Sequence, residues 1–248
     1  MSKKDLNIIK KHWENIKTDS LKDKNLQIVE RSAIIDYLKN LKVDALADIG
    51  CGNCEDTVYF SKYAKSVDAF DYSEKMIKDA NKVVADGKVK NINIAKLDLI
   101  TDRIIHSYDT VVTKRSLINL GNFDNQKKAI KKIHKSLNEN GHFLMLECST
   151  DGLANMNSIR KLFFLDEIAM PFHNYHFVMD QLLEFLKSYF KVVSWRYFSD
   201  YFFLTRFVGP LVEKNEPYKY DHLFKELSSV QVIEKQIGPQ FLLLLKKK

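Results

Sequence analysis

The stretch Asp48-Ile49-Gly50-Cys51-Gly52-Asn53-Cys54 indicates the fold of this chain most clearly. It follows an apolar, strand-like segment at residues 45–49 and leads into an expected helix near residues 55–63. Glycine at positions 50 and 52 lets the backbone turn sharply and approach a ligand, because no Cβ stands in the way. We therefore predict a strand, a glycine-rich turn and a helix whose free N–H groups face a ligand.

Strands and helices alternate along the chain around this turn. Further strands are expected at residues 67–70, 92–97, 108–113, 142–146, 191–198 and 240–245. Helices are expected at residues 3–18, 25–40, 74–84, 125–137, 179–189 and 222–229, and residues 138–141 read as a stop after the helix at 125–137. This order is typical of a parallel sheet with helices on both faces, so we predict a doubly wound α/β fold.

Length and composition are those of one ordinary folded domain, with 248 residues, 45% of them apolar and 29% charged. We expect a single domain over residues 1–248, with an N-terminal helical cap at 1–40 and a cofactor-binding core at 41–150. Residues 151–190 and 199–238 are expected to form substrate-binding or lid segments, since loops this long usually bind ligands. Fifteen of the 29 aromatic residues lie between Phe163 and Phe207, where they either fill a core or line a pocket.

Charge, the length of apolar runs and cysteine content indicate which partners the protein binds and in which compartment it lies. The net charge is +7, but 33 of the 39 basic residues are lysines, which are dispersed among acids as on a solvated surface. The longest apolar run has five residues, 241–245, which is too short to cross a bilayer. Three cysteines suit a reducing compartment. We expect a cytoplasmic monomer or homodimer that acts on a small molecule and binds neither nucleic acid nor membrane.

Three acidic residues lie at the carboxyl ends of three successive expected strands. Asp71 lies 19 residues after Gly52, where this type of fold places an acid that accepts both hydroxyls of a ribose. Asp48 is suited to pair with an amine, and Asp98 to accept a hydrogen bond from an adenine amino group. A nicotinamide-binding fingerprint has glycine at position 55, but this chain has Glu55, which would repel a pyrophosphate. These residues favour an adenosyl amino acid over NAD.

This pattern resembles the class I S-adenosylmethionine-dependent methyltransferases, in particular a bacterial group that acts on small molecules. The resemblance implies a Rossmann-like sheet of seven strands in the order 3-2-1-4-5-7-6, with the last strand antiparallel. It implies S-adenosylmethionine as cofactor, S-adenosylhomocysteine as product and no metal. One departure is Cys54, where the family commonly has a third glycine. The cofactor-binding residues that it implies are Asp48, Gly50, Cys51, Gly52, Asp71, Tyr72, Met76, Asp98, Leu99 and Lys114.

The acceptor site is expected beyond the fourth and fifth strands. His173 and His176 are the candidate general bases, because imidazole titrates near neutral pH. His173 is preferred, because Pro171-Phe172-His173-Asn174 resembles a substrate loop of that group. Arg115 and Arg206 suggest an anionic acceptor, although structural salt bridges would explain them equally well. Glu147 and Tyr201 are further candidates that could instead be supports. The full set of candidate substrate-binding residues is Arg115, Asn119, Glu147, Asn174, Tyr175, His176, Tyr201 and Arg206.

The predicted activity is methyl transfer to a small phosphorylated, sugar or nucleotide-linked acceptor, with oxygen as the expected methyl acceptor. The resemblance implies a role in modifying either sugars of surface polysaccharides or small metabolites. Two alternatives remain at this point. One is a nicotinamide-dependent oxidoreductase, and the other is a non-catalytic or RNA-binding module that uses the lysine-rich face of the helix at 125–137.

Overall fold

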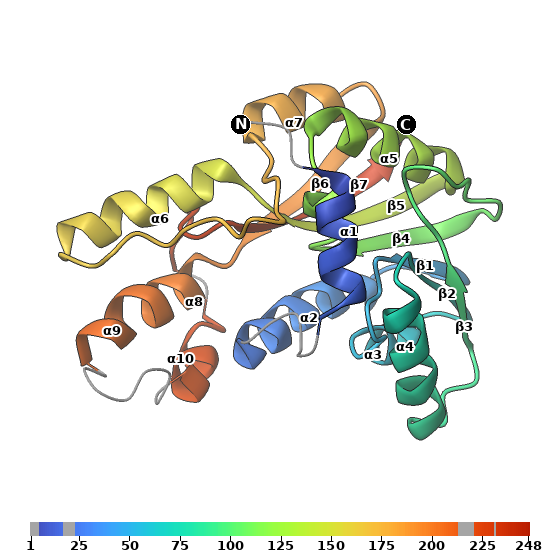
Figure 1. Ribbon diagram of the computed structural model, residues 1–248, viewed down its shortest axis with the longest axis horizontal. Helices are drawn as coiled ribbons and strands as arrows, with labels where there is room; N and C mark the ends of the chain where they lie inside the picture. The colour runs from blue at the N-terminus through green and yellow to red at the C-terminus, as the bar shows by residue number, and fades with distance from the viewer. Residues whose placement is uncertain (1–4, 17–22, 213–220, 231) are drawn as a thin grey trace.

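A computed structural model describes residues 5–16, 23–212, 221–230 and 232–248 (Figure 1). These residues contain one sheet with strand order β3-β2-β1-β4-β5-β7-β6. Strands β1 to β5 pair in parallel, whereas β7 runs antiparallel to both β5 and β6. This confirms the predicted fold and strand order. The strands are β1 Ala45–Ile49, β2 Ser66–Asp71, β3 Ile92–Lys96, β4 Tyr108–Lys114, β5 Leu137–Cys148, β6 Phe190–Tyr197 and β7 Gln240–Lys247.

Helices connect the strands, and several begin at a side chain that accepts a backbone N–H. Ser73 accepts the N–H of Met76, and Asn122 accepts that of Asn125. The α-helices are α1 Leu6–Glu14, α2 Lys24–Leu38, α3 Thr57–Phe60, α4 Glu74–Asp86, α5 Phe123–Ser136, α6 Thr150–Leu162, α7 Met179–Leu186, α8 Ser199–Phe203, α9 Gly209–Val212 and α10 Asp221–Leu227. Shorter elements are the 3₁₀ turns η1 Ser61–Tyr63 and η2 Leu117–Asn119 and the π-helix η3 Leu204–Val208.

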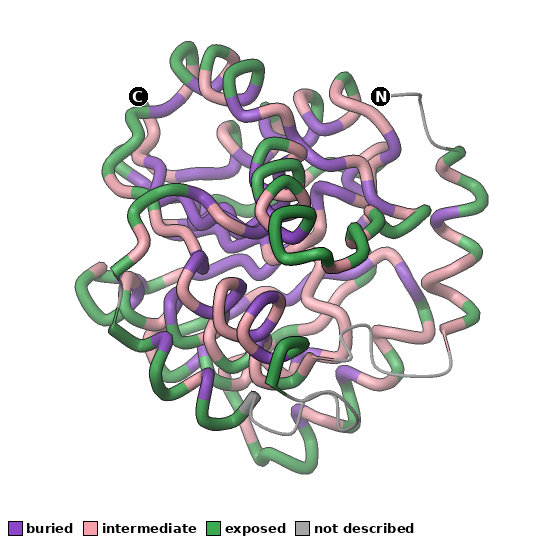
Figure 2. The backbone as a smooth tube through the Cα atoms, turned by 90° about the vertical axis from the view of Figure 1, so that its left-hand side faces the viewer, coloured by how far each residue is buried: buried purple, intermediate pink, exposed green. Residues whose placement is uncertain are grey.

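The two faces of the sheet carry two apolar cores. Val111 of β4 faces the core shared with α5 and α7, whereas its neighbour Val112 faces the core shared with α2 and α8. Successive side chains alternate in this way because a strand has a period of two residues. Buried segments accordingly run through the middle of the molecule in Figure 2, and exposed segments lie around its edge and on the coils that face the viewer. The buried aromatic residues between Phe163 and Phe207 belong to these cores. This favours the interpretation that the aromatic residues of this stretch fill a core over the interpretation that they line a pocket.

Several expected boundaries differ in the structure. Helix α6 was not expected, because residues such as Gly152, Asn155 and Asn157 are weak helix formers. It forms because Ser149 caps its first turn and Met156 is buried. The expected helix at 55–63 is shorter, and β5 begins at Leu137, directly after α5, rather than at residue 142. Residues 1–4 and 17–22 of the expected N-terminal cap lie outside the described residues.

The remaining elements are arranged around one end of the sheet. α1 crosses the view of Figure 1 between α5 and α7 above and α2 to α4 below. α6, α8, α9 and α10 extend to the left and form a lobe. The segment between β6 and β7 contains α8 to α10, of which only α10 was expected, at residues 222–229. Residues 213–220 and 231 of this segment lie outside the described residues. These placements leave a cavity at the carboxyl ends of β1, β2 and β4.

Candidate active site

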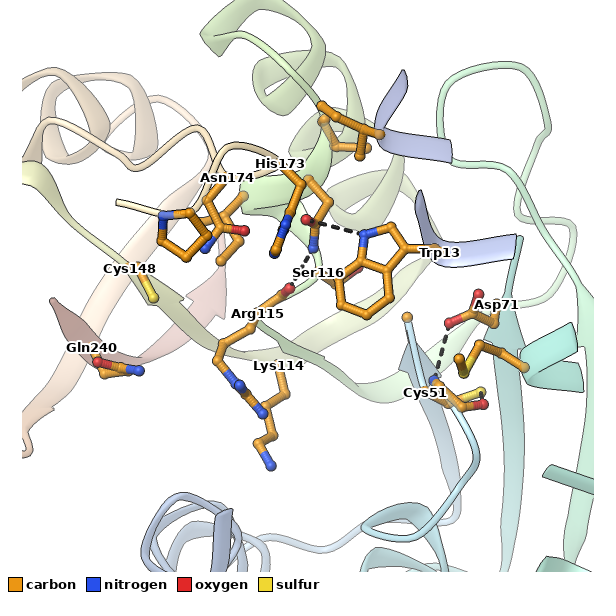
Figure 3. A pocket seen from close by; sticks show the side chains of 18 of the residues that line it. Trp13, Cys51, Asp71, Lys114, Arg115, Ser116, Cys148, His173, Asn174 and Gln240 are labelled. Atoms are coloured by element: carbon orange, nitrogen blue, oxygen red, sulfur yellow. Dashed lines mark hydrogen bonds between the residues drawn. The ribbon is translucent and has the colours of Figure 1, made fainter. Parts of the chain in front are cut away.

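A cavity of about 910 Å³ lies over the carboxyl ends of the parallel strands. Its walls come from the glycine-rich turn, the starts of α2 and α4, the segment after β4, the loop at residues 168–176 and α1. Figure 3 shows that the residues fall into two groups, with Asp71 and Cys51 on one side and Cys148, Asn174 and Gln240 on the other. We call these the cofactor half and the acceptor half.

The glycine-rich turn has the backbone conformation that its sequence predicts. Gly50 has a φ of +80°, and a Cβ there would stand 2.2 Å from the hydroxyl oxygen of Ser116. Gly52 has a φ of +56°, and a Cβ there would meet no atom within 4 Å, so its backbone faces open space. Cys54, at the position where relatives commonly have glycine, is buried and also has a positive φ of 62°. The chain therefore keeps the left-handed turn at this position with a small side chain.

Asp71 joins the turn to the start of α4. Its carboxylate accepts the backbone N–H of Gly52 at 3.0 Å and that of Ser73 at 2.9 Å. Burial raises the pKa of Asp71, and these hydrogen bonds act in the opposite direction. The carboxylate lines the cavity, as expected, and also holds the turn in position.

Asp48 is a buried acid at the end of β1 that lines the same cavity. It accepts a hydrogen bond from the hydroxyl of Thr57 at 2.6 Å. Burial raises the pKa of Asp48 to about 7, and the Thr57 hydroxyl opposes this shift. A carboxyl in this state is only partly ionised near neutral pH, and an approaching cation would favour its charged form.

The third acid, Asp98, is already paired in the structure. It accepts a hydrogen bond from Lys10 of α1 and, at 2.9 Å, from the backbone N–H of Ile100. The hydroxyl of Tyr72 donates to the backbone oxygen of Lys10 at 3.1 Å. The cofactor half is therefore closed on this side by α1, a contact that the sequence did not indicate.

Trp13 and His12 bring α1 over the acceptor half as well. The indole N–H of Trp13 donates to the side-chain oxygen of Asn119 at 3.3 Å, and the amide of Asn119 donates to the backbone oxygen of Arg115 at 2.9 Å. The ring of His12 stacks on His173, with centroids 4.6 Å apart. Trp13 lies between the two halves in Figure 3. Trp13 was not among the predicted site residues. The feature that could have indicated it is a tryptophan in a mostly polar N-terminal helix.

Glu147 supports the acceptor half from behind. Its carboxylate accepts the backbone N–H groups of Ser116, Leu117 and Ile118 at 3.0–3.3 Å, and this fixes the segment that presents Arg115. Burial raises the pKa of Glu147 to about 7. Glu147 does not line the cavity, so the interpretation as a support is favoured over direct contact with substrate.

Lys114, which was expected beside the cofactor, and the two arginines that line the cavity have acidic partners. Lys114 and Arg115 each approach Glu30 to 3.3 Å, and Lys114 also pairs with Asp56. Arg206, on the π-helix, pairs with Asp23, which also accepts the hydroxyl of Tyr201 at 2.7 Å.

Sixteen of the nineteen candidate residues line one cavity, although they are spread along the chain from Asp48 to Arg206. Two of the remaining three are Tyr201, which is fully buried in the core, and Tyr175, whose backbone N–H donates to Ile118; the third is Glu147. The sixteen are Asp48, Gly50, Cys51, Gly52, Asp71, Tyr72, Met76, Asp98, Leu99, Lys114, Arg115, Asn119, His173, Asn174, His176 and Arg206. Among the described residues, no group of three His, Cys, Asp or Glu side chains is arranged to hold a metal ion. None of the described helices is long and apolar enough to span a membrane.

Comparisons with known proteins agree with this geometry. A family model described as a methyltransferase domain matches residues 42–196. The chain is similar to the N-methyltransferase NodS of Bradyrhizobium japonicum WM9 in complex with S-adenosylhomocysteine, at 14% identity and a TM-score of 0.61 over 98% of this chain and 97% of that one. It is also similar to magnesium protoporphyrin IX methyltransferase of Synechocystis PCC 6803 with bound S-adenosylhomocysteine, at 13% identity and a TM-score of 0.63 over 98% and 100%. No curated protein matches the chain.

The sheet order and the acid-lined cavity at the strand ends define the class I methyltransferase fold. With a family model that matches residues 42–196, the chain belongs to the methyltransferase-domain family. Its cofactor is S-adenosylmethionine, as the resemblance implied.

Proposed function

We propose that this protein transfers a methyl group from S-adenosylmethionine to an oxygen atom of a small anionic acceptor. The observation that carries the proposal is a single cavity that joins an acid-lined half to a half with Arg115 and His173. The first half suits a cationic adenosyl amino acid. The second half offers groups that bind an anion and accept a proton.

The residues of the cofactor half fit the cofactor chemically. The open space at Gly52 admits a ligand close to the backbone, and Asp71 offers a carboxylate to ribose hydroxyls. Asp48, whose burial disfavours its charge, gains a partner when an ammonium group binds beside it. When bound, S-adenosylmethionine supplies a methyl group on a positively charged sulfur.

The acceptor half positions the second substrate and handles its proton. Arg115 is the residue we assign to an anionic group of the acceptor. Its positive φ of 52° is held by the hydrogen bonds that Glu147 makes to the following residues. His173 lines the cavity and is assigned to accept the proton that a hydroxyl loses on methylation. α1 covers both halves and so helps to exclude water.

Two observations favour this proposal over the alternatives. Glu55 lines the cavity beside the glycine-rich turn, where its carboxylate would repel the pyrophosphate of NAD. Three of the five lysines of α5 have contacts within the molecule. Lys127 pairs with Asp124, and Lys131 lies over the ring of Tyr189. Lys132 donates to three backbone oxygens at 2.7–3.0 Å, so this helix is not a free basic face.

Titration calorimetry with S-adenosylmethionine, S-adenosylhomocysteine and NAD tests the cofactor half directly. We expect both adenosyl ligands to bind in the micromolar range and NAD not to bind. Binding of NAD alone would overturn the proposal. A screen of acceptors that measures release of S-adenosylhomocysteine then tests the acceptor half. Methylation of uncharged acceptors alone would contradict the proposal that the acceptor is anionic.

A further inference from the structure

Four amide side chains among the described residues are at least nine-tenths buried: Gln126, Asn174, Gln236 and Gln240. Two of them have evident structural roles. The amide of Gln126 donates to the backbone oxygens of Leu117 and Tyr175, at 3.2 and 2.7 Å. The amide of Gln236 donates to the hydroxyl of Ser149 at 2.9 Å and to the backbone oxygen of Pro239 at 3.2 Å.

Asn174 and Gln240 differ from these two in both location and bonding. Both line the cavity, which Gln126 and Gln236 do not. The structure gives neither side chain a hydrogen bond to another described residue. Oε1 of Gln240 is completely buried without a partner, and so is Oε1 of Gln126, but the amide of Gln126 donates two hydrogen bonds whereas that of Gln240 donates none to a described residue. In Figure 3 both lie in the acceptor half, with Arg115 between them and Asp71.

A completely buried amide oxygen without a partner, such as Oε1 of Gln240, is costly in a folded protein, because it loses hydrogen bonds to water and gains none in return. An apolar side chain of similar size would avoid this cost. The two residues also stand on fixed backbone, since Gln240 begins β7 opposite Cys148 and Tyr175, next to Asn174, donates its N–H to Ile118 at 2.6 Å. Fixed, buried and unpaired amides in a cavity wall are suited to a ligand that supplies the missing partners.

We propose that Asn174 and Gln240 determine acceptor specificity by binding hydroxyl groups of a phosphorylated sugar or polyol. An amide offers an oxygen that accepts and an N–H that donates, and a hydroxyl is complementary because it does both. An ionised carboxylate or phosphate only accepts, and an ammonium only donates. The inference rests on the proposed function, in which Arg115 binds the anionic group of the acceptor. It adds that Asn174 and Gln240 bind the hydroxyl groups of the same acceptor.

Thermal unfolding of the full chain provides the first test, which needs no acceptor. Methionine is nearly isosteric with glutamine and has no amide. Gln240→Met is expected to leave the melting temperature equal or raised, since no internal hydrogen bond is lost. The matched control Gln236→Met is expected to lower it by a few degrees. If Gln240→Met lowers the melting temperature as much as the control, or fails to fold, Gln240 is a structural support and the proposal is wrong.

Binding to the S-adenosylhomocysteine complex provides the second test. The probes are glucose 1-phosphate, glucose 6-phosphate and glycerol 3-phosphate, with inorganic phosphate for comparison. We expect the wild type to bind at least one hydroxyl-bearing probe more tightly than phosphate. Gln240→Met and Asn174→Ala should each weaken that binding about tenfold, with unchanged affinity for S-adenosylhomocysteine.

Two results would overturn the proposal at this stage. One is binding of the probes that is no tighter than binding of phosphate, and the other is probe affinity that both substitutions leave unchanged. In either case normal binding of S-adenosylhomocysteine would leave the proposed function standing. Absence of that binding in the wild type would instead contradict the proposed function itself.

Discussion

Lys10 of the N-terminal helix donates a hydrogen bond to Asp98, the acid that follows the third strand of the sheet. This contact, together with the bond from Tyr72 to the backbone of Lys10, places α1 across the cofactor half. Trp13, one turn further along α1, reaches Asn119 in the acceptor half. A single short helix therefore contacts both halves of the cavity, and ligand binding in either half is expected to be sensed by its side chains.

Trp13 should report cofactor binding by fluorescence. The chain has two tryptophans, and Trp195 is half exposed on the edge strand β6, whereas Trp13 lines the cavity. We expect S-adenosylhomocysteine to change the emission of Trp195→Phe protein, because only Trp13 then remains and its surroundings change polarity. The change should vanish in Trp13→Phe. A ligand-dependent signal that persists in Trp13→Phe but not in Trp195→Phe would contradict the placement of α1.

Replacement of Asp71 should weaken binding of the adenosyl ligands. Asp71→Ala removes the carboxylate assigned to the ribose and frees two backbone N–H groups of the turn. We expect a loss of affinity of roughly tenfold to hundredfold for S-adenosylhomocysteine by calorimetry. Asp109→Ala is the matched control, because Asp109 also accepts two backbone N–H groups but lies away from the cavity. Equal affinities in the two variants would refute the ribose assignment.

Cofactor affinity should depend on pH through Asp48. Its pKa in the folded protein is about 7, so a bound ammonium group that favours ionisation makes binding release a proton. Affinity for S-adenosylhomocysteine should therefore rise with pH and level off above about 7, by at most about tenfold per pH unit. Calorimetry in buffers of different ionisation enthalpy measures the released proton. Thr57→Val removes the hydrogen bond that lowers this pKa, so it should move the dependence to higher pH.

The same acid should make the unliganded protein less stable as the pH rises. Between about pH 4 and 7 the unfolded chain loses the proton of Asp48 while the folded chain keeps it, so the free energy of unfolding falls over this range. Asp48→Asn removes this contribution. Denaturant unfolding at several pH values measures it, and identical pH profiles of wild type and Asp48→Asn would show that Asp48 has an ordinary pKa.

His173 should affect turnover and spare cofactor binding. With an acceptor from the screen, His173→Ala is expected to reduce kcat on the order of 100-fold, as for loss of a general base. His12→Phe is the control, because it keeps a ring beside His173 and removes the neighbouring imidazole. Full activity of His173→Ala would reject the base assignment, whereas an equal loss in both variants would point to packing of the loop on α1.

The strands and most helices could be predicted because their signals are local. The β-branched run Thr110-Val111-Val112-Thr113 marks β4, and Ser73 and Asn122 stand where helix caps belong. The glycine-rich turn is equally local, since Gly50 and Gly52 have the positive φ angles that such a turn requires. α6 was missed because its own residues favour a helix only weakly, and a cap and burial of Met156 stabilise it.

The sequence by itself therefore determined the strands, the glycine-rich turn and the acids at the strand ends, since each depends on neighbours a few residues apart. The strand order followed from the family resemblance that these motifs carry. Only the tertiary structure decided which candidates share the cavity. Glu147 lies behind it because three backbone N–H groups hold its carboxylate, and Tyr201 lies in the core. Trp13 and Gln240 enter it from opposite ends of the chain. Contacts between residues so far apart depend on how whole elements pack, which no local pattern encodes.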